Sequence, residues 1–266
     1  MLSVRAAGLD IAYRETGSGD PVFLINGTGE SSATWGAMPE AVSQRYRCIA
    51  VDLRDTGGSS VVDAPYTPAD LAGDVAAVAG ALDAGPAHIV GFSLGGAVAQ
   101  ELAIARPELV RSLVLLSTWP RSDAWFVSQM RSWQALRRGF GPDAEGFDRA
   151  LDPWMFSPAT MEDDGLLRGI RTMWAKGPDQ SAEAFVRQCE ADIAHDAVER
   201  LPGVHAPALV LVGLDDICTP VRYARALVDL LPDAALVTIP RAGHCAVFEQ
   251  PDEVRASITG FLDAVV

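Results

Sequence analysis

The chain has 266 residues, 49% of them hydrophobic and 21% charged, which is typical of a globular protein with one large domain or one domain plus an insertion. Its formal net charge of −14 and sequence pI near 4.6 create a field that repels nucleic-acid phosphates and anionic lipid headgroups. No stretch reaches the roughly 18 apolar residues of a membrane helix, and residues 1–13 lack the apolar segment of a secretory signal. We therefore expect a cytoplasmic protein whose partner is a small-molecule substrate rather than a nucleic acid or a membrane.

The four cysteines are scattered along the chain without a C-x-x-C pair. This spacing fits neither a zinc site nor a dense disulfide framework, so we expect reduced thiols. The residues are Cys48, Cys189, Cys218 and Cys245.

Short apolar runs alternate with longer amphipathic segments, a pattern typical of β/α units around a mostly parallel sheet. In chain order, the expected elements are strands 2–6, 9–14 and 21–25, helix 35–45, strand 46–51, helix 69–83, strand 87–91, helix 94–105, strand 110–116, strand 208–212, helix 221–231, strand 235–239 and helix 252–265.

Residues 119–200 break this rhythm because they contain helical stretches and no β-like run. They hold five of the six tryptophans and four of the six methionines, which predicts a helical insertion with its own small core.

The segment Gly91-Phe92-Ser93-Leu94-Gly95 reads G-x-S-x-G and lies between an expected strand and an expected helix. A serine on such a sharp turn takes a strained backbone conformation, and glycines on both sides remove colliding side chains. The pentapeptide is expected by chance in roughly one sequence in eight of this length. Its interpretation as a nucleophile therefore depends on a base and an acid elsewhere in the chain.

His244 is the histidine best placed to be the base, because it lies in a glycine-containing loop directly after an expected strand. A serine hydroxyl needs such a base to take its proton. His88 lies within a strand and is interpreted as a scaffold residue. His195 and His205 are expected to be surface or capping residues.

The acid that orients the base is expected at another strand end, between Ser93 and His244 in the chain. Asp215 and Asp216 follow strand 208–212. Asp216 is preferred for its spacing of four residues before a proline, with Asp215 as the alternative. The aspartate that is not catalytic would be a solvated or helix-capping residue.

Five motifs together resemble the α/β-hydrolase fold family over essentially the whole chain. They are the turn N-G-T-G at 26–29, the loop D-L-R-D-T-G-G-S at 52–59, the serine turn at 91–96, the acid loop at 213–220 and the histidine loop at 243–251. The chain is most similar to small capped members such as 3-oxoadipate enol-lactonases, aminoacrylate hydrolases, cofactor-free haloperoxidase-type esterases and polyketide methylesterases.

The resemblance implies a mostly parallel eight-stranded sheet flanked by helices, with a helical cap after the sixth strand. The core would comprise residues 1–118 and 201–266, and the cap residues 119–200. It also implies no metal and no cofactor.

The catalytic roles implied are Ser93 as nucleophile, His244 as base and Asp216 as acid. Backbone N–H groups of Thr28 and Leu94 would form the oxyanion hole.

Two positions depart from the family pattern. Asn26 stands where relatives usually have histidine, and Asp55 replaces a common glycine. Neither change removes a catalytic group. We further expect the Thr28 hydroxyl to act as a third oxyanion donor.

The substrate pocket is expected to be partly apolar. The residues predicted to line it are Asn26, Gly27, Trp119, Val247 and Phe248. This favours a carboxylic-ester or lactone hydrolase acting on a small to medium apolar or aromatic substrate. The alternatives are C–C bond hydrolysis or a lyase reaction with the same triad, and a non-catalytic ligand receptor. The sequence does not indicate the natural substrate or the oligomeric state.

Overall fold

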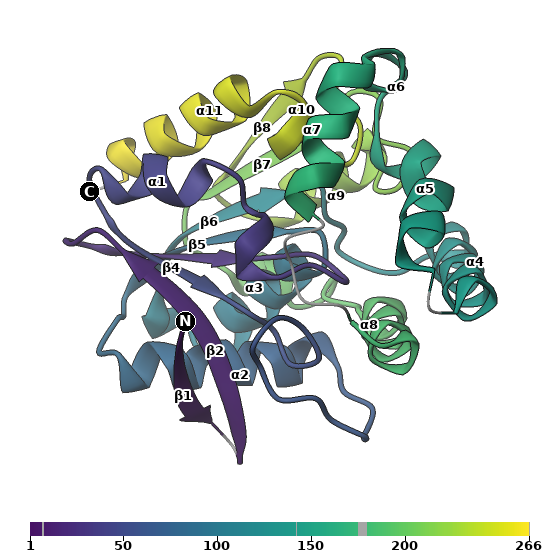
Figure 1. Cartoon of the computed structure of the whole chain (residues 1–266). Helices are drawn as coiled ribbons and strands as arrows, with labels where there is room; N and C mark the ends of the chain where they lie inside the picture. The colour runs from purple at the N-terminus through teal and green to yellow at the C-terminus, as the bar shows by residue number, and fades with distance from the viewer. Residues whose placement is uncertain (7, 142, 175–179, 266) are drawn as a thin grey trace.

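Eight β-strands form one sheet at the centre of the molecule (Figure 1). The computed structural model describes residues 1–6, 8–141, 143–174 and 180–265. The strands are β1 Leu2–Ala6, β2 Leu9–Thr16, β3 Pro21–Ile25, β4 Arg47–Val51, β5 Ala87–Phe92, β6 Val110–Leu116, β7 Ala208–Gly213 and β8 Ala234–Ile239. Their order is β1-β2-β4-β3-β5-β6-β7-β8, and only the pairs β1–β2 and β2–β4 are antiparallel. The expectation of a mostly parallel eight-stranded sheet is confirmed.

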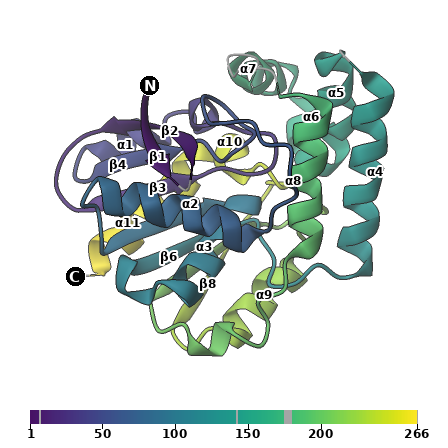
Figure 2. The same ribbon diagram turned by 90° about the horizontal axis from the view of Figure 1, so that it is seen from below.

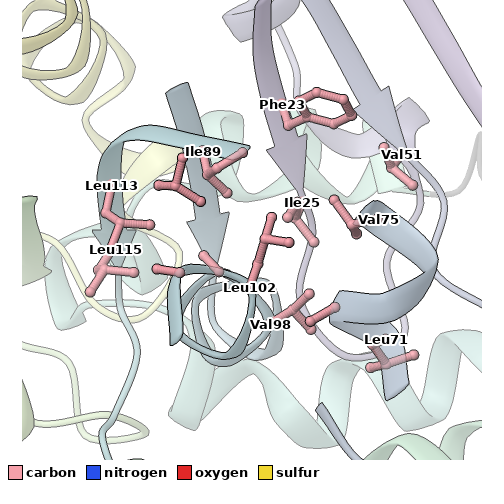
Figure 3. Packing of buried hydrophobic residues seen from close by; sticks show 14 of the residues in the cluster. Phe23, Ile25, Val51, Leu71, Val75, Ile89, Val98, Leu102, Leu113 and Leu115 are labelled. Carbon is pink, nitrogen blue, oxygen red and sulfur yellow. The ribbon is translucent and has the colours of Figure 1, made fainter. Parts of the chain in front are cut away.

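Helices cover both faces of this sheet because its inner strands are apolar on both sides. In β3, for example, Phe23 packs into one core cluster and the next residue, Leu24, into the other. The first cluster includes side chains from α2 Pro68–Ala81, α3 Leu94–Ala105 and α9 Val221–Leu230. The second includes side chains from α1 Met38–Ser43, α10 Ala246–Glu249 and α11 Pro251–Ala264. Figure 3 shows how Val98 and Leu102 of α3 pack against the sheet.

In the described part of the segment between β6 and β7 there are five further helices, and we refer to them as the cap helices. They are α4 Ala124–Phe140, α5 Ala144–Met155, α6 Pro158–Glu162, α7 Asp164–Trp174 and α8 Ala182–Ala194. Figures 1 and 2 show them on one side of the sheet, with α8 nearer to the strands than α4. They occupy the segment in which the sequence predicts a helical insertion. The division of the chain into core and cap at 118/119 and 200/201 stays a prediction.

The segment after β3 differs from the sequence prediction. The expected helix 35–45 is shortened to α1 and is preceded by a 3₁₀ turn, Ser32–Thr34. Gly36 has a φ of 59°, which interrupts a right-handed helix, and Pro39 is suited to the first helical turn, where no N–H is needed. Helix α10 was not expected, because four residues are too few to show a helical periodicity.

His195 is a capping residue, which is one of the two alternatives expected from the sequence, but it does not lie on the surface. His195 ends α8 but is buried, with 2% exposure, and its Nε2 lies 3.2 Å from the Oε1 atom of Gln100. Gln100 is itself a buried polar residue of α3, a partner that the sequence around His195 does not reveal. His205 is exposed as expected. His88 is a buried scaffold residue whose Nδ1 lies 2.7 Å from the Ser112 hydroxyl.

Replacing Leu102 with alanine tests the packing of α3 on the sheet. Leu102 is 1% exposed, so Leu102→Ala is expected to lower the free energy of unfolding by about 2–5 kcal/mol through lost burial and an unfilled cavity. Urea denaturation followed by circular dichroism measures this change. The matched control is Val61→Ala, at a position that is 69% exposed, where we expect a change within about 0.5 kcal/mol.

Candidate active site

Ser93 lies on the turn between β5 and α3, at the carboxyl end of the sheet. Its φ of 53° and ψ of −117° place it in a backbone region that non-glycine residues rarely adopt. The glycines make this turn possible: a Cβ at Gly91 would collide with the backbone of Gly95, and one at Gly95 with the backbone of Ile25. The turn therefore holds the serine side chain clear of the sheet and the helix.

The structure brings Ser93, His244 and Asp216 together. His244 Nε2 lies 3.0 Å from the Ser93 hydroxyl, and its Nδ1 lies 3.1 Å from Asp216 Oδ2. Asp216 is held in place by Thr219, which donates its backbone N–H at 2.7 Å and its hydroxyl at 2.8 Å. Asp215 is exposed. Of the two candidate acids, Asp216 is the one that contacts the histidine.

The electrostatic surroundings of His244 favour its charged form. Burial lowers the pKa of His244, but the neighbouring Cys218 and Asp216 outweigh burial and raise the pKa well above its ordinary value. The imidazole is 2% exposed and packs against the Phe92 ring at 5.1 Å. This site can accept a proton at Nε2 and stabilise the resulting imidazolium through Asp216.

Two backbone N–H groups beside Ser93 are free to bind an anion. Leu94 is the first residue of α3, where helical N–H groups have no intrahelical acceptor. Thr28 lies on the turn after β3, directly after Gly27, where a Cβ would lie 3.0 Å from the Ser93 Cβ. Among the described residues, neither N–H has an acceptor. Together they form a candidate oxyanion hole.

Asn26 supports the turn that carries Thr28. Its side-chain amide donates to the carbonyl of Ser31 and, at 2.9 Å, to the hydroxyl of Thr34. Asn26 is 2% exposed. The asparagine in place of the usual histidine is thus a structural support for the loop.

Helix α8 holds the same turn from the other side. Thr28 donates its hydroxyl to Asp192 Oδ2 at 2.7 Å, and the Gly29 N–H donates to Gln188 Oε1 at 2.8 Å. Gln188 and Asp192 are 0% and 1% exposed. The Thr28 hydroxyl is therefore already engaged, and the structure does not support our expectation that it serves as a third oxyanion donor.

A buried ion pair fixes α8 to the core. Arg187 donates two hydrogen bonds to the Asp55 carboxylate, at 2.9 and 3.0 Å, and the Tyr66 hydroxyl donates a third at 2.9 Å. Asp55 has a φ of 70°, which explains why relatives commonly have glycine there. In this chain the carboxylate replaces the glycine and binds a cap helix.

A cavity of about 870 Å³ opens between the cap helices and the turn after β3. Thr28, Gly29 and Glu30 line it on the core side. The apolar residues that line it on the cap side are Phe147, Leu151, Met155, Leu167, Trp174 and Phe185. The cavity therefore lies next to the candidate oxyanion hole. Its cap wall combines these apolar side chains with charged ones, among them Arg137, Arg149, Arg168 and Arg171.

None of the five residues predicted to form the pocket is among those that line this cavity. Trp119 is fully buried, donates its indole N–H to the Ser122 hydroxyl and packs against Phe126, with ring centres 4.1 Å apart and ring planes tilted by 33°. Phe248 is also buried and packs against Trp174, a cavity residue, at 5.7 Å. Val247 is 4% exposed. Their contribution to substrate binding stays a prediction.

Three residues around this turn were not predicted from the sequence: Glu30, Gln188 and Asp192. Glu30 directly follows the N-G-T-G turn, which was a usable signal. The other two are polar residues four positions apart on one helix, a spacing that places them on the same face but does not reveal what that face contacts.

The described residues contain no group of three or more His, Cys, Asp or Glu side chains that could hold a metal ion. Within the same part of the chain, no helix has both the length and the apolar character needed to span a membrane.

Comparison with known proteins identifies the family. Residues 22–257 match the model of the alpha/beta hydrolase family. The chain belongs to the alpha/beta hydrolase family.

Individual members of the alpha/beta hydrolase family are similar over nearly their whole length. The Mycobacterium tuberculosis protein BpoC, whose name assigns it provisionally to the non-heme bromoperoxidases, is 33% identical over 97% of this chain and 99% of its own. A 2-hydroxy-6-oxononadienedioate/2-hydroxy-6-oxononatrienedioate hydrolase from Burkholderia vietnamiensis is 30% identical over 96% of this chain and 91% of its own. The structure of a thermophilic esterase from Thermogutta terrifontis superposes with a TM-score of 0.87 at 26% identity, covering 99% and 98% of the two chains.

Replacing Gln188 with leucine tests the support of the turn by α8. Gln188→Leu removes the acceptor of the Gly29 N–H, so Thr28 is expected to be less well positioned and kcat to fall about tenfold with little change in KM. Steady-state kinetics on a short p-nitrophenyl ester measures both constants. Gln44→Leu, at an exposed position on the far side of the core, is the control, and equal kcat values for both variants would contradict the assignment.

A double-mutant cycle tests the pair formed by Asp55 and Arg187. Arg187→Ala leaves the Asp55 carboxylate buried without its partner and is expected to lower the free energy of unfolding by about 3–5 kcal/mol. Asp55→Gly also removes the pair but relieves the strained φ, so adding it to Arg187→Ala should restore part of the stability. Urea denaturation of the four proteins measures the coupling, and strictly additive effects would argue against a direct interaction.

Proposed function

We propose that this alpha/beta hydrolase is a serine hydrolase that cleaves a carboxylic ester or lactone through an acyl-enzyme. The observation that carries the proposal is the 3.0 Å separation of the Ser93 hydroxyl and His244 Nε2, beside two backbone N–H groups without acceptors. A hydroxyl, a base and preorganised donors are the groups that acyl transfer requires.

In the first step, His244 takes the proton of Ser93 as the serine oxygen attacks the substrate carbonyl. Asp216 fixes the imidazole tautomer and stabilises the imidazolium. The N–H groups of Thr28 and Leu94 bind the negative charge that develops on the carbonyl oxygen. His244 then protonates the leaving alcohol, which leaves an acyl group on Ser93.

In the second step, His244 removes a proton from water as the water attacks the acyl-enzyme. The same oxyanion hole binds the second tetrahedral intermediate. The intermediate collapses, the acid is released and Ser93 regains its proton. Apart from the substrate and the attacking water, protein side chains and backbone groups supply every group used in these steps.

The dimensions and the walls of the cavity support a small to medium apolar or aromatic substrate. Its volume of about 870 Å³ lies within the range of small-molecule sites. Aromatic side chains such as Phe147, Trp174 and Phe185 line it. The esterase from Thermogutta terrifontis, as a similar structure, also favours ester hydrolysis.

The relative from Burkholderia vietnamiensis favours a second candidate. It is named for the hydrolysis of a 2-hydroxy-6-oxo-dienedioate, which is not an ester. Hydrolysis of a C–C bond with the same three residues is therefore the alternative function. Measuring the rates of hydrolysis of p-nitrophenyl esters, of lactones and of a 2-hydroxy-6-oxo-dienoate distinguishes the two candidates.

Labelling with a fluorophosphonate probe tests the catalytic role of Ser93. The wild-type protein is expected to bind one probe molecule covalently, while Ser93→Ala is expected to bind none and to lose at least about a thousandfold in kcat. Intact-protein mass spectrometry measures the adduct. Ser43→Ala is the control. A folded wild-type protein that does not react with the probe would contradict the proposal.

The pH dependence tests His244 and Asp216 together. A general base must be neutral, so kcat/KM is expected to be low below the pKa of His244 and to rise with pH through a value above 6.5, its ordinary pKa. Besides Cys218, Asp216 is the neighbour that raises this pKa. Asp216→Asn removes its contribution, so the rise should move to lower pH, and kcat should fall by a factor on the order of 10⁴. Asp215→Asn, at the adjacent exposed position, is the control, and its profile should match that of the wild type. Identical profiles for Asp216→Asn and the wild type would exclude the role assigned to Asp216.

A further inference from the structure

The loop after β7 carries a thiol that contacts His244 and that the proposed mechanism does not use. Cys218 lies in the chain between Asp216 and Thr219, whose side-chain oxygens lie 3.1 Å from His244 Nδ1. A side-chain hydrogen bond joins the Cys218 thiol itself to His244. Cys218 is 1% exposed, and burial raises the pKa of its thiol above the ordinary value of 9.0. His244 therefore has a neutral sulfur atom beside it near pH 7, in addition to its acid partner.

A side-chain amide from the cap helices contacts the same thiol. Gln129 of α4 donates its Nε2–H to Cys218 Sγ, with 2.9 Å between the two atoms. Cys218 also belongs to the apolar cluster that contains Phe126 and Met130 of α4. The sulfur atom is thus a direct link between a cap helix and His244.

Packing alone does not explain a glutamine at position 129. Gln129 is 6% exposed, and its Oε1 atom is buried without a hydrogen-bond partner among the described residues. A buried acceptor without a donor destabilises the folded chain, and an apolar side chain would avoid this cost. In the part of the chain that the structure describes, the contact with the Cys218 thiol is the one hydrogen bond that the amide makes. A buried polar residue that costs stability in this way is typical of a functional site.

We propose that Cys218 is a positioning residue for His244 and that Gln129 connects it to α4, so that a cap helix helps to orient the imidazole. This inference rests on the proposed function. The proposed mechanism requires Nε2 to face the Ser93 hydroxyl in one step and water in the next, while Nδ1 keeps its contact with Asp216. The ring can still tilt about that contact. A hydrogen bond to sulfur restricts the tilt and favours the imidazolium that forms in each step.

Other ionisable groups also lie close to His244. Besides Asp216 and Cys218, the charge of His244 acts on Glu30 and Asp192. Burial raises the pKa of Glu30 to about 8 and that of Asp192 to about 7, so both carboxyl groups titrate near neutral pH. Neither group is altered by a substitution at position 218. A difference in the pKa of His244 between the wild type and a Cys218 variant therefore reports on the thiol.

A matched pair of substitutions separates positioning from packing. Alanine and serine side chains have similar volumes, but serine keeps a group that can form hydrogen bonds. We expect Cys218→Ala to lower kcat about tenfold with little change in KM, because the imidazole is less well oriented, and Cys218→Ser to recover most of this loss. If the thiol served packing alone, serine would be the worse replacement, because it places a hydroxyl in the apolar cluster.

Steady-state kinetics on a short p-nitrophenyl ester measures both constants. The control is Cys48→Ala, which removes the same atom from another thiol that is 1% exposed but lies in the second core cluster. This control should keep the kcat of the wild type.

The pKa of His244 provides a second measurement, which does not need turnover. Nuclear magnetic resonance of protein labelled with carbon-13 in its histidines follows the protonation of each imidazole, and His244→Gln assigns the signal. Cys218→Ala removes a hydrogen bond to the charged form, so the pKa of His244 should fall by roughly half a pH unit to one pH unit. Gln129→Leu should also lower it, and should have no further effect when added to Cys218→Ala.

Two results would overturn the inference. One is a kcat of Cys218→Ala that equals or exceeds that of Cys218→Ser. The other is a pKa of His244 that neither Cys218→Ala nor Gln129→Leu changes. Failure of the proposed function looks different, because the wild type would then hydrolyse no ester while the pKa of His244 still responded to Cys218→Ala.

Discussion

The strained turn at Ser93 is the constraint on which the rest of the active site depends. A serine with a φ of 53° is possible there because Gly91 and Gly95 let the strand, the helix and β3 approach without side chains between them. The turn positions two groups. The Ser93 side chain faces His244, and the N–H of Leu94, at the start of α3, has no acceptor among the described residues. The position of the proposed nucleophile and half of the candidate oxyanion hole are thus consequences of one backbone conformation.

The other half of the candidate oxyanion hole depends on the cap helices. The turn with Thr28 is held by Asn26 from the core and by Gln188 and Asp192 from α8, and the pair of Arg187 with Asp55 fixes that helix. A change in the position of α8 would therefore alter both the cavity and the donor that Thr28 provides. The cavity under the cap helices and the candidate oxyanion hole therefore share the same set of contacts.

The sequence predicts the strands well because strand patterns are local, and it proposes the three residues that the structure brings together. Strand ends, glycine spacing and chain order are enough to propose Ser93, His244 and Asp216. The contacts of α8 could not be predicted, since Thr28 and Asp192 are 164 residues apart and neither segment carries a signal for the other. For the same reason Asp55 could be noticed as a departure from glycine but not explained until its partner Arg187 was located. The burial of His195 also depends on a distant helix.

A structure of the protein with a phosphonate bound covalently to Ser93 tests the central claim most directly. The account predicts that the phosphoryl oxygen lies within hydrogen-bond distance of the backbone nitrogens of both Thr28 and Leu94, with His244 Nε2 close to the serine oxygen. The Thr28 hydroxyl should still contact Asp192. A phosphoryl oxygen that points away from Thr28 and Leu94, or an adduct on another residue, would contradict the account.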